Sequence, residues 1–571
     1  MNQKDFQAEI IRKTTGEIRT FLAQLAYETS GYKSLHNLTE QVEHQYHGRF
    51  LIELIQNAHD AMNEHYEAGG DEGRLEILIE RNEAPYGSLY VANDGLPFTK
   101  SNFECLSQLG QSDKDPEKSI GNKGIGFRSV LEISNSPEIY SRSSKDSEKF
   151  DGYCFYFSPD VTKLFETPIL KLIQGDDKPC SPLDGALSLI EWSREQLLNF
   201  RSLYSSQDDQ WLSKELKYLS PYLLPLPVHS SHKIEAIKAF EVQGFASVIR
   251  LPFKSESARH YAITVMQELD ENTILFLDRV KFLSLNSGDR LRLVERKMQP
   301  LNDSNNGQEI RLEVIEDGTE GNIKKKYWLW SVTLGGEEKQ EEREEITKTI
   351  VEDNLPGRWP ELTKATVSLA VRVDGQLEHG CINIYLPTQV PTGCAAHFNG
   401  PFYGDMSRTD INFKKSFNML LLKRISRMAV EVILASLAGK NVDQCRAIVD
   451  ILAPCTEEAH AGREWFKVLM EACEEKELNL AEQSIILTDE KWTSIKYASL
   501  IPEIDSPKVL TPAILRERAA FGAIHKDLMG RKKELASLFE AFEIRCLSPQ
   551  SRYGSNSRKY CRAVTNSGGN S

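Results

Sequence analysis

Three polar side chains in one short segment, Glu53, Asn57 and Asp60, have the types and the spacing to perform chemistry together. They stand at i, i+4 and i+7, so a helix would place them along a single face. A carboxylate one turn from an amide can polarise a water molecule and supply an oxygen ligand to a divalent cation. Mg²⁺ suits such a face, because it takes few protein oxygens and keeps water and phosphate as its other ligands. The alternative is an ordinary solvated helix face.

The helix that would carry these side chains is predicted by apolar residues that recur at three- and four-residue steps between Phe50 and Met62. This is the period of a half-buried helix, whose apolar stripe faces a core. The helix would therefore present its polar residues on a second face, away from that stripe.

A second motif, Asn93-Asp94-Gly95, follows the strand-like segment 75–91 and is predicted to form a tight turn. Such turns occur in any fold, so the turn alone indicates no function. Its functional interpretation is a polar side chain at the end of a strand that accepts a hydrogen bond from the amino group of a base.

A third motif contains Gly121, Gly124 and Gly126, followed by a helix-like segment that starts near Phe127. Glycines allow backbone N–H groups to wrap around an anion, and the start of a helix adds favourable dipole charge. The motif lacks the Gly-Lys-Ser/Thr ending of a P-loop and the strand-turn-helix opening of a dinucleotide fold. The polar segment 101–119 before it suits either a lid over a nucleotide or an exposed loop. Together the motifs indicate a nucleotide pocket.

In this order the motifs resemble those of the GHKL ATPases, the superfamily of DNA gyrase, the ninety-kilodalton heat-shock chaperones, histidine kinases and MutL. Within it, Asn-Asp-Gly-Leu-Pro-Phe-Thr and Ile-Gly-Asn-Lys-Gly-Ile-Gly-Phe-Arg-Ser-Val resemble the branch that contains sacsin and the plant NO VEIN proteins. The resemblance implies an ATP-binding α/β domain built as an α+β two-layer sandwich. It is close over residues 50–130, and loose over segments 245–285 and 385–415.

The resemblance also implies roles for single residues. Glu53 would activate the attacking water, Asn57 would ligate Mg²⁺, and Asp60 would belong to the same nucleotide-binding face. The loop from Gly121 to Phe127 would cradle the phosphates of ATP. Lys123 departs from the aromatic or small residue of the chaperone loops, and could reach a phosphate as a point charge.

Recognition of the base is open between two residues. With Gly95 aligned, the position of the family's adenine-reading Asp falls on Asn93, and Asp94 follows one residue later. Either side chain could accept a hydrogen bond from the adenine amino group. The family supports its Asp with a Thr from a later strand, and the corresponding segment here offers Ser247.

Arg408 is a candidate for contacting the γ-phosphate from a second domain, as a cationic residue does in other GHKL enzymes. An arginine suits the charge that develops on a phosphoryl group in transfer. The alternative is a structural arginine that pairs with Asp405 or Asp410.

The composition excludes several classes of protein. With 571 residues, 40% of them hydrophobic, the chain can form several cores, and its net charge of −14 disfavours a general nucleic-acid binder. The ten cysteines form no CxxC pair, so we interpret them as core or surface thiols of a reducing compartment. No signal peptide and no run of about 20 apolar residues is found, which predicts a soluble, cytoplasmic protein.

We expect four regions along the chain. They are an ATP-binding domain at 1–285 with an insertion at about 160–235, a second α/β domain at 286–440, a small mixed region at 441–545, and a disordered tail at 546–571. Proteins of the resembled type are often longer, so the sequence leaves open whether the C-terminus is native or truncated.

The expected function is Mg-dependent ATP binding with slow hydrolysis that drives lid closure and domain rearrangement, in a chaperone-like protein or a larger assembly. The alternative is a nucleotide sensor without turnover, or a scaffold subunit, for example of a bacterial defence system. No sequence feature names a protein client. The predicted helix at 4–29 would either pack against the pocket or cross to the partner subunit of a homodimer.

Overall fold

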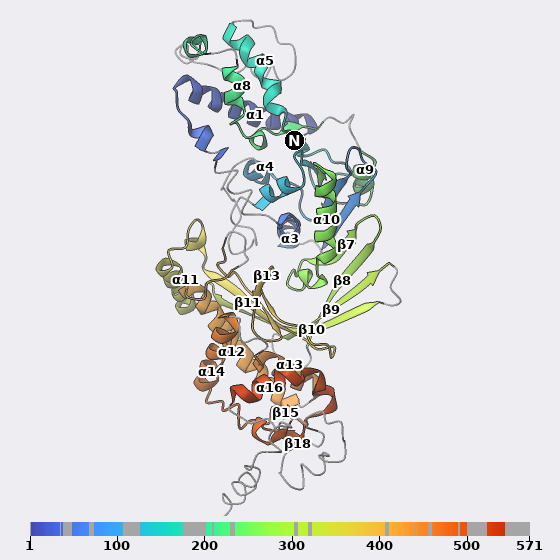
Figure 1. Ribbon diagram of the computed structural model, residues 1–571, viewed down its shortest axis with the longest axis vertical. Helices are drawn as coiled ribbons and strands as arrows, with labels where there is room; N and C mark the ends of the chain where they lie inside the picture. Colours follow the sequence, from blue (N-terminus) through green and yellow to red (C-terminus); the bar gives the residue numbers. More distant parts are fainter. Residues whose placement is uncertain are drawn as a thin grey trace, which may run out of the picture. The chain divides into compact units, whose positions relative to one another are not determined.

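A computed structural model of the protein describes residues 2–34, 36–37, 48–67, 73–106, 126–174, 201–207, 210–228, 234–301, 307–317, 322–405, 410–439, 441–454, 460–488, 491–499 and 522–542. The chain divides into two compact units (Figure 1). Unit 1 comprises Met1–Arg296 and Glu313–Ile323, and unit 2 comprises Lys297–Leu312 and Lys324–Ser571.

Unit 1 is built on short strands with alternating or fully buried side chains. They are β1 (Gly73–Glu80), β2 (Ser88–Asn93), β3 (Glu138–Ser141), β4 (Phe155–Tyr156), β5 (Leu226–Pro227), β6 (Ser247–Pro252) and β7 (Val280–Asn286). In β1, alternate residues such as Leu75, Ile77 and Ile79 are buried, as expected for a strand with one face on a core. All six residues of β2 are buried, so this strand lies at the centre of unit 1.

The helices of unit 1 precede, interrupt and follow these strands. They are α1 (Gln3–Ala26), α3 (Phe50–Glu67), α4 (Lys100–Leu106), η1 (Gly126–Glu132), α5 (Val161–Gln174), α8 (Trp211–Leu216), η2 (Pro221–Leu223), α9 (Glu235–Val242), α10 (Glu256–Glu268) and η4 (Glu271–Ile274). The apolar stripe predicted for 50–62 is buried in α3, where Leu54 and Ile55 are at most 1% exposed. A separate apolar cluster joins α1 to α5 and α8, with Phe21 and Phe165 in its interior.

Unit 2 contains the longer strands of the chain. The strands β8 (Leu291–Pro300), β9 (Gly307–Glu316) and β10 (Ile323–Gly335) have residues in both units, and β11 (Lys364–Arg372), β12 (Cys381–Ile384), β13 (Leu386–Pro391) and β14 (Ala396–Asn399) belong to unit 2. Short strands follow, namely β15 (Ile486–Leu487), β16 (Trp492–Thr493), β17 (Ala498–Ser499) and β18 (Gly522–Ala523).

The helices of unit 2 enclose one large core. They are α11 (Gln340–Glu352), η5 (Trp359–Glu361), α12 (Ser416–Gly439), α13 (Val442–Leu452), α14 (His460–Glu475), η6 (Ile495–Tyr497), η7 (Lys526–Arg531) and α16 (Lys532–Ala541). Figure 1 shows α12, α13 and α14 gathered beside β11 and β13, which they contact. The core between them includes Phe398, Phe417 and Trp465, each at most 1% exposed.

Within the described residues, fourteen strands form one mixed sheet. Its order is β13-β12-β14-β11-β10-β9-β8-β7-β1-β2-β6-β3-β4-β5. β1 pairs with β7, and β12 with β14, in parallel, while β2 pairs with both β1 and β6 in antiparallel. The α/β class predicted from the sequence is therefore confirmed. None of the described helices is long and apolar enough to cross a membrane.

The helices and strands predicted from the sequence agree best with the structure where the pattern of apolar residues is long. The helices expected at 4–29 and 50–62 are α1 and α3. The segment 381–391 contains two strands, β12 and β13, separated by Tyr385, whose φ of 62° turns the chain. The predicted tail and most of the predicted lid lie outside the described residues.

Candidate functional site

Helix α3 carries the first group of candidate residues. Glu53 and Asp60 are 6% and 3% exposed, and Asn57 between them is half-buried. The helix packs against β1, β2 and η1. The sequence spacing and the helical fold thus place the three side chains on one element.

The turn after β2 lies directly on the backbone of α3. A Cβ added to Gly95 would come within 2.6 Å of the carbonyl carbon of Ala61 and 2.7 Å of the backbone nitrogen of Met62. The next residue, Leu96, donates its N–H to the carbonyl oxygen of Ala61 at 2.9 Å. Only glycine has room in this contact. Gly95 therefore brings the second motif against the helix of the first.

Asn93, the last residue of β2, is held by two hydrogen bonds. Its Nδ2 donates to Oγ of Ser247 on β6 at 2.9 Å, and its Oδ1 accepts from the N–H of Gly95 at 3.1 Å. Asn93 and Ser247 are direct cross-strand neighbours, so the sheet register fixes the first bond. The side chain is 7% exposed. The structure thus joins the two residues that the sequence placed 154 positions apart.

Asp94 is committed to a different partner. Its Oδ1 accepts from the backbone N–H of Arg74 at 2.7 Å, and its Oδ2 accepts from Nε of Arg74 at 3.0 Å. The ammonium group of Lys145 donates to the carbonyl oxygen of Asp94 at 2.5 Å. Of the two residues left open by the sequence, Asn93 is therefore the one bonded to Ser247, and Asp94 ties the turn to β1.

Charged neighbours surround the polar face of α3. Nε of Arg49 lies 3.8 Å from Oε1 of Glu53. On the following turn, His59 places Nε2 3.3 Å from Oδ1 of Asp278 and Nδ1 3.9 Å from Oδ1 of Asp60. Burial alone would lower the pKa of His59, but the two carboxylates raise it above its usual value. Asp60 therefore lies within ion-pair distance of a histidine that also contacts Asp278.

The third motif is described only at its end. Gly126 and Phe127 begin η1, which packs against α3, so this end of the motif lies beside the first motif. The segment forms a 3₁₀-helix rather than an α-helix in its first turns. Gly121, Lys123 and Gly124 fall outside the described residues, as does Arg408 in unit 2. The proposed roles of these four residues stay predictions.

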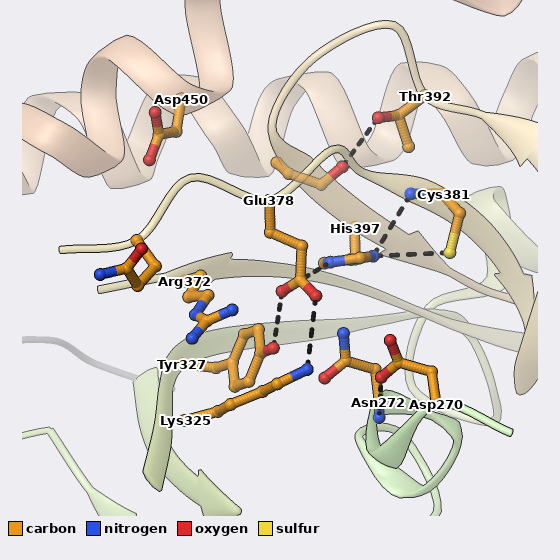
Figure 2. Close-up of polar contacts among 12 residues, drawn as sticks. Asp270, Asn272, Lys325, Tyr327, Arg372, Glu378, Cys381, Thr392, His397 and Asp450 are labelled. Atoms are coloured by element: carbon orange, nitrogen blue, oxygen red, sulfur yellow. Dashed lines mark hydrogen bonds and ion pairs between the residues drawn. The ribbon is translucent and has the colours of Figure 1, made fainter. Parts of the chain in front are cut away.

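A polar cluster in unit 2 was not predicted from the sequence. Figure 2 shows Glu378, Cys381 and His397 in contact, with Tyr327 and Lys325 beside Glu378. These residues come from three strands, β10, β12 and β14, and from the connection before β12, and no spacing motif links them. In the part of the chain that the structure describes, no three His, Cys, Asp or Glu side chains are grouped so as to hold a metal ion.

Comparisons with known proteins agree with the resemblance seen in the motifs. Residues 33–163 match the Sacsin domain family. The chain is 35% identical over 117 residues to "Protein NO VEIN" of Arabidopsis thaliana, and 39% identical over 100 residues to "Sacsin" of Homo sapiens. These matches cover 20% and 16% of this chain, but only 4% and 2% of the two relatives. The predicted similarity to sacsin and NO VEIN is confirmed, over a small part of those proteins.

Proposed function

We propose that unit 1 binds ATP with Mg²⁺ and hydrolyses it slowly, because residues 33–163 match the Sacsin domain family. In this proposal unit 1 is the GHKL-type ATP-binding module, an α+β two-layer sandwich, that the motifs resemble. The activities of the whole relatives are not assigned to this chain, because it covers only 4% and 2% of their lengths.

One observation carries the proposal, namely the hydrogen bond between Asn93 and Ser247 at the end of the sheet that meets α3. The resembled family reads adenine with a strand-end residue that is supported by a hydroxyl from a later strand. Asn93 has that support, and Asp94 is occupied by Arg74. We therefore assign base recognition to Asn93, whose carboxamide oxygen accepts from the adenine amino group in addition to Gly95.

The polar face of α3 has side chains suited to the phosphate end of the nucleotide. Asn57 offers a half-buried amide oxygen, and the Glu53 carboxylate lies one helical turn before it. Mg²⁺ prefers hard oxygen ligands and completes its shell with phosphate and water. In the proposal, Asn57 holds the cation and Glu53 orients the attacking water as a general base. The bound Mg²⁺ would neutralise charge on the phosphates.

A second function is favoured by one neighbour of Glu53. The guanidinium of Arg49 lies 3.8 Å from the Glu53 carboxylate, and both side chains are largely shielded from solvent. A guanidinium at this distance forms an ion pair with the carboxylate and competes with the attacking water for it. The alternative is therefore a nucleotide sensor that binds ATP without turnover, or one that needs a partner protein to displace Arg49.

The test is titration calorimetry of Mg·ATP into the wild-type protein, with phosphate release followed in parallel. Glu53→Ala should retain binding and lose turnover, whereas Asn57→Ala should lose Mg·ATP affinity by about tenfold or more, because a metal ligand is removed. Glu64→Ala is the matched control, because Glu64 is exposed on the same helix. It should bind and hydrolyse ATP like the wild type.

The outcomes separate the two functions. Binding with turnover supports the ATPase, and binding without turnover supports the sensor. An absence of ATP binding by the folded protein would overturn both. Unchanged turnover in Glu53→Ala would remove Glu53 from the role of general base, and unchanged affinity in Asn57→Ala would remove the metal assignment.

A further inference from the structure

Two neighbouring strands of unit 2 place a cysteine beside a histidine. β12 and β14 run parallel, with Ile382 opposite Phe398, so the preceding residues Cys381 and His397 are also neighbours. Nδ1 of His397 lies 3.5 Å from Sγ of Cys381 (Figure 2). This contact is set by the sheet register, and does not depend on a flexible loop.

The hydrogen bonds of the ring define which nitrogen faces the sulfur as an acceptor. The backbone N–H of Cys381 donates to Nδ1 of His397 at 3.3 Å, so Nδ1 carries a lone pair in this arrangement. The ring proton is then on Nε2, which lies 3.5 Å from Oε2 of Glu378. His397 is 4% exposed, so water does not compete for either nitrogen.

Glu378 is fixed behind the histidine as an anion. The hydroxyl of Tyr327 donates to its Oε2 at 2.6 Å, and Nζ of Lys325 lies 3.8 Å from its Oε1. Burial would raise the pKa of Glu378, but these neighbours and His397 lower it to about 2. Burial would lower the pKa of His397, yet Cys381 and Glu378 raise it to about 9. Cys381 and Glu378 therefore stabilise the imidazolium that forms when His397 takes the thiol proton.

The sulfur itself has a second polar contact and partial access to solvent. Nδ2 of the buried Asn383 lies 3.6 Å from Sγ of Cys381, while it donates its two hydrogens to the carbonyl oxygens of Cys381 at 3.0 Å and of Phe398 at 3.1 Å. Cys381 is half-buried, whereas Cys394, Cys445 and Cys473 are buried and burial raises the pKa of each of these thiols to about 12. Cys381 therefore combines a neighbouring base with access to solvent, and these three thiols do not have that access.

The connection that carries Glu378 back to Cys381 is also closely packed. A Cβ added to Gly380 would lie 1.9 Å from the carbonyl oxygen of Ala396, next to His397. The chain can pass this point only with glycine, so the spacing between the carboxylate and the thiol is held by the backbone. A half-buried structural thiol would not need this alignment of carboxylate, imidazole and sulfur.

We propose that Cys381 is a nucleophilic thiol, with His397 as its proton acceptor and Glu378 as the residue that positions the ring, and that it takes soft carbon electrophiles. In the reaction with iodoacetamide, the thiol proton moves to Nδ1 of His397. The sulfur then forms a bond to the methylene carbon, and iodide leaves with the electron pair of the C–I bond. The product is a thioether at Cys381.

The test is the rate of iodoacetamide labelling of the intact native chain at pH 7, measured cysteine by cysteine with mass spectrometry. Cys105, which is also half-buried, is the internal control. Cys381 should react about tenfold faster than Cys105, because Nδ1 of His397 is placed to take the proton from its sulfur as the new bond forms. His397→Gln should slow labelling of Cys381 by about tenfold and leave Cys105 unchanged.

Glu378 is tested by Glu378→Gln and Glu378→Asp. The first should slow labelling of Cys381 severalfold, and the second should recover part of the rate, because it restores the carboxylate. The proposal is overturned if Cys381 in the wild-type protein reacts no faster than Cys105. It is also overturned if both His397→Gln and Glu378→Gln label Cys381 at the wild-type rate. The comparison of Cys381 with Cys105 in the wild-type protein needs no substitution, so it tests the proposal even if a substitution unfolds unit 2.

Discussion

At the scale of single residues, the choice between Asn93 and Asp94 depends on which side chain has a partner. Asn93 uses both ends of its carboxamide inside unit 1, toward Ser247 and Gly95, whereas Asp94 pairs with Arg74. The amide of Asn93 both donates and accepts, whereas the carboxylate of Asp94 only accepts, so the two successive residues have different partners. A substitution that changes only the charge at position 93 can therefore test base recognition without breaking the turn.

We predict that Asn93→Asp binds Mg·ATP at least as tightly as the wild type. The Ser247 hydroxyl and the Gly95 N–H can both donate to the new carboxylate, and a charged acceptor strengthens the bond from the adenine amino group. Asn93→Ala should weaken ATP binding by about tenfold, since a hydrogen bond of about 1 kcal/mol and its buried partners are lost. Calorimetry with ATP and GTP measures both effects. Equal loss for the two nucleotides would argue against base recognition by Asn93.

At the scale of elements, the turn after β2 contacts α3, and this contact joins the residue proposed to recognise the base to the helix face proposed to hold Mg²⁺. Gly95 is the point of closest approach, because a Cβ there would meet the backbone of Ala61 and Met62. Backbone atoms cannot move aside as a flexible side chain can. The two motifs can therefore be kept together only if this position remains a glycine.

We predict that Gly95→Ala lowers stability by about 1–3 kcal/mol through overpacking, and weakens Mg·ATP binding by about tenfold. Gly16→Ala in α1 is the matched control, because no atom lies within 4 Å of its added Cβ. That change should raise stability by up to about 1 kcal/mol, as alanine favours a helix interior, and leave ATP affinity unchanged. Thermal unfolding and calorimetry test both proteins. Normal ATP affinity in a folded Gly95→Ala would separate the turn from the site.

At the scale of the molecule, the two compact units have distinct candidate chemistry, with the nucleotide site in unit 1 and the thiol cluster in unit 2. A ligand stabilises only the cooperative region that it binds, by about 2.7 kcal/mol at a hundredfold excess over its Kd. The location of ATP binding can therefore be read from local protection, even without a detectable change elsewhere in the chain.

We predict that Mg·ATP slows amide hydrogen exchange in α3, β2 and β6, and leaves α13 and α14 in unit 2 nearly unchanged. Hydrogen exchange with mass spectrometry resolves these segments. Glu53→Ala should show the same protection, because it removes turnover and not binding. Protection confined to unit 2 would place the nucleotide outside the proposed site.

The sequence by itself determined the features that depend on residues close together along the chain. The three-to-four-residue period predicted α3, and the order of the polar motifs identified the similarity to sacsin and NO VEIN. Periodicity and motif order can be read from the linear sequence, because they depend on residues that are close together along one helix or strand.

Only the tertiary structure decided which residues act together across the sheet. The sequence offers Ser247 as the supporting residue, and the pairing of β2 with β6 joins it to Asn93 rather than to Asp94, while the pairing of β12 with β14 places Cys381 beside His397. The cysteines show no spacing signal, so the sequence predicts only core or surface thiols. Strand register is set by the packing of distant segments, and that packing leaves no mark in the linear spacing of the side chains it brings together.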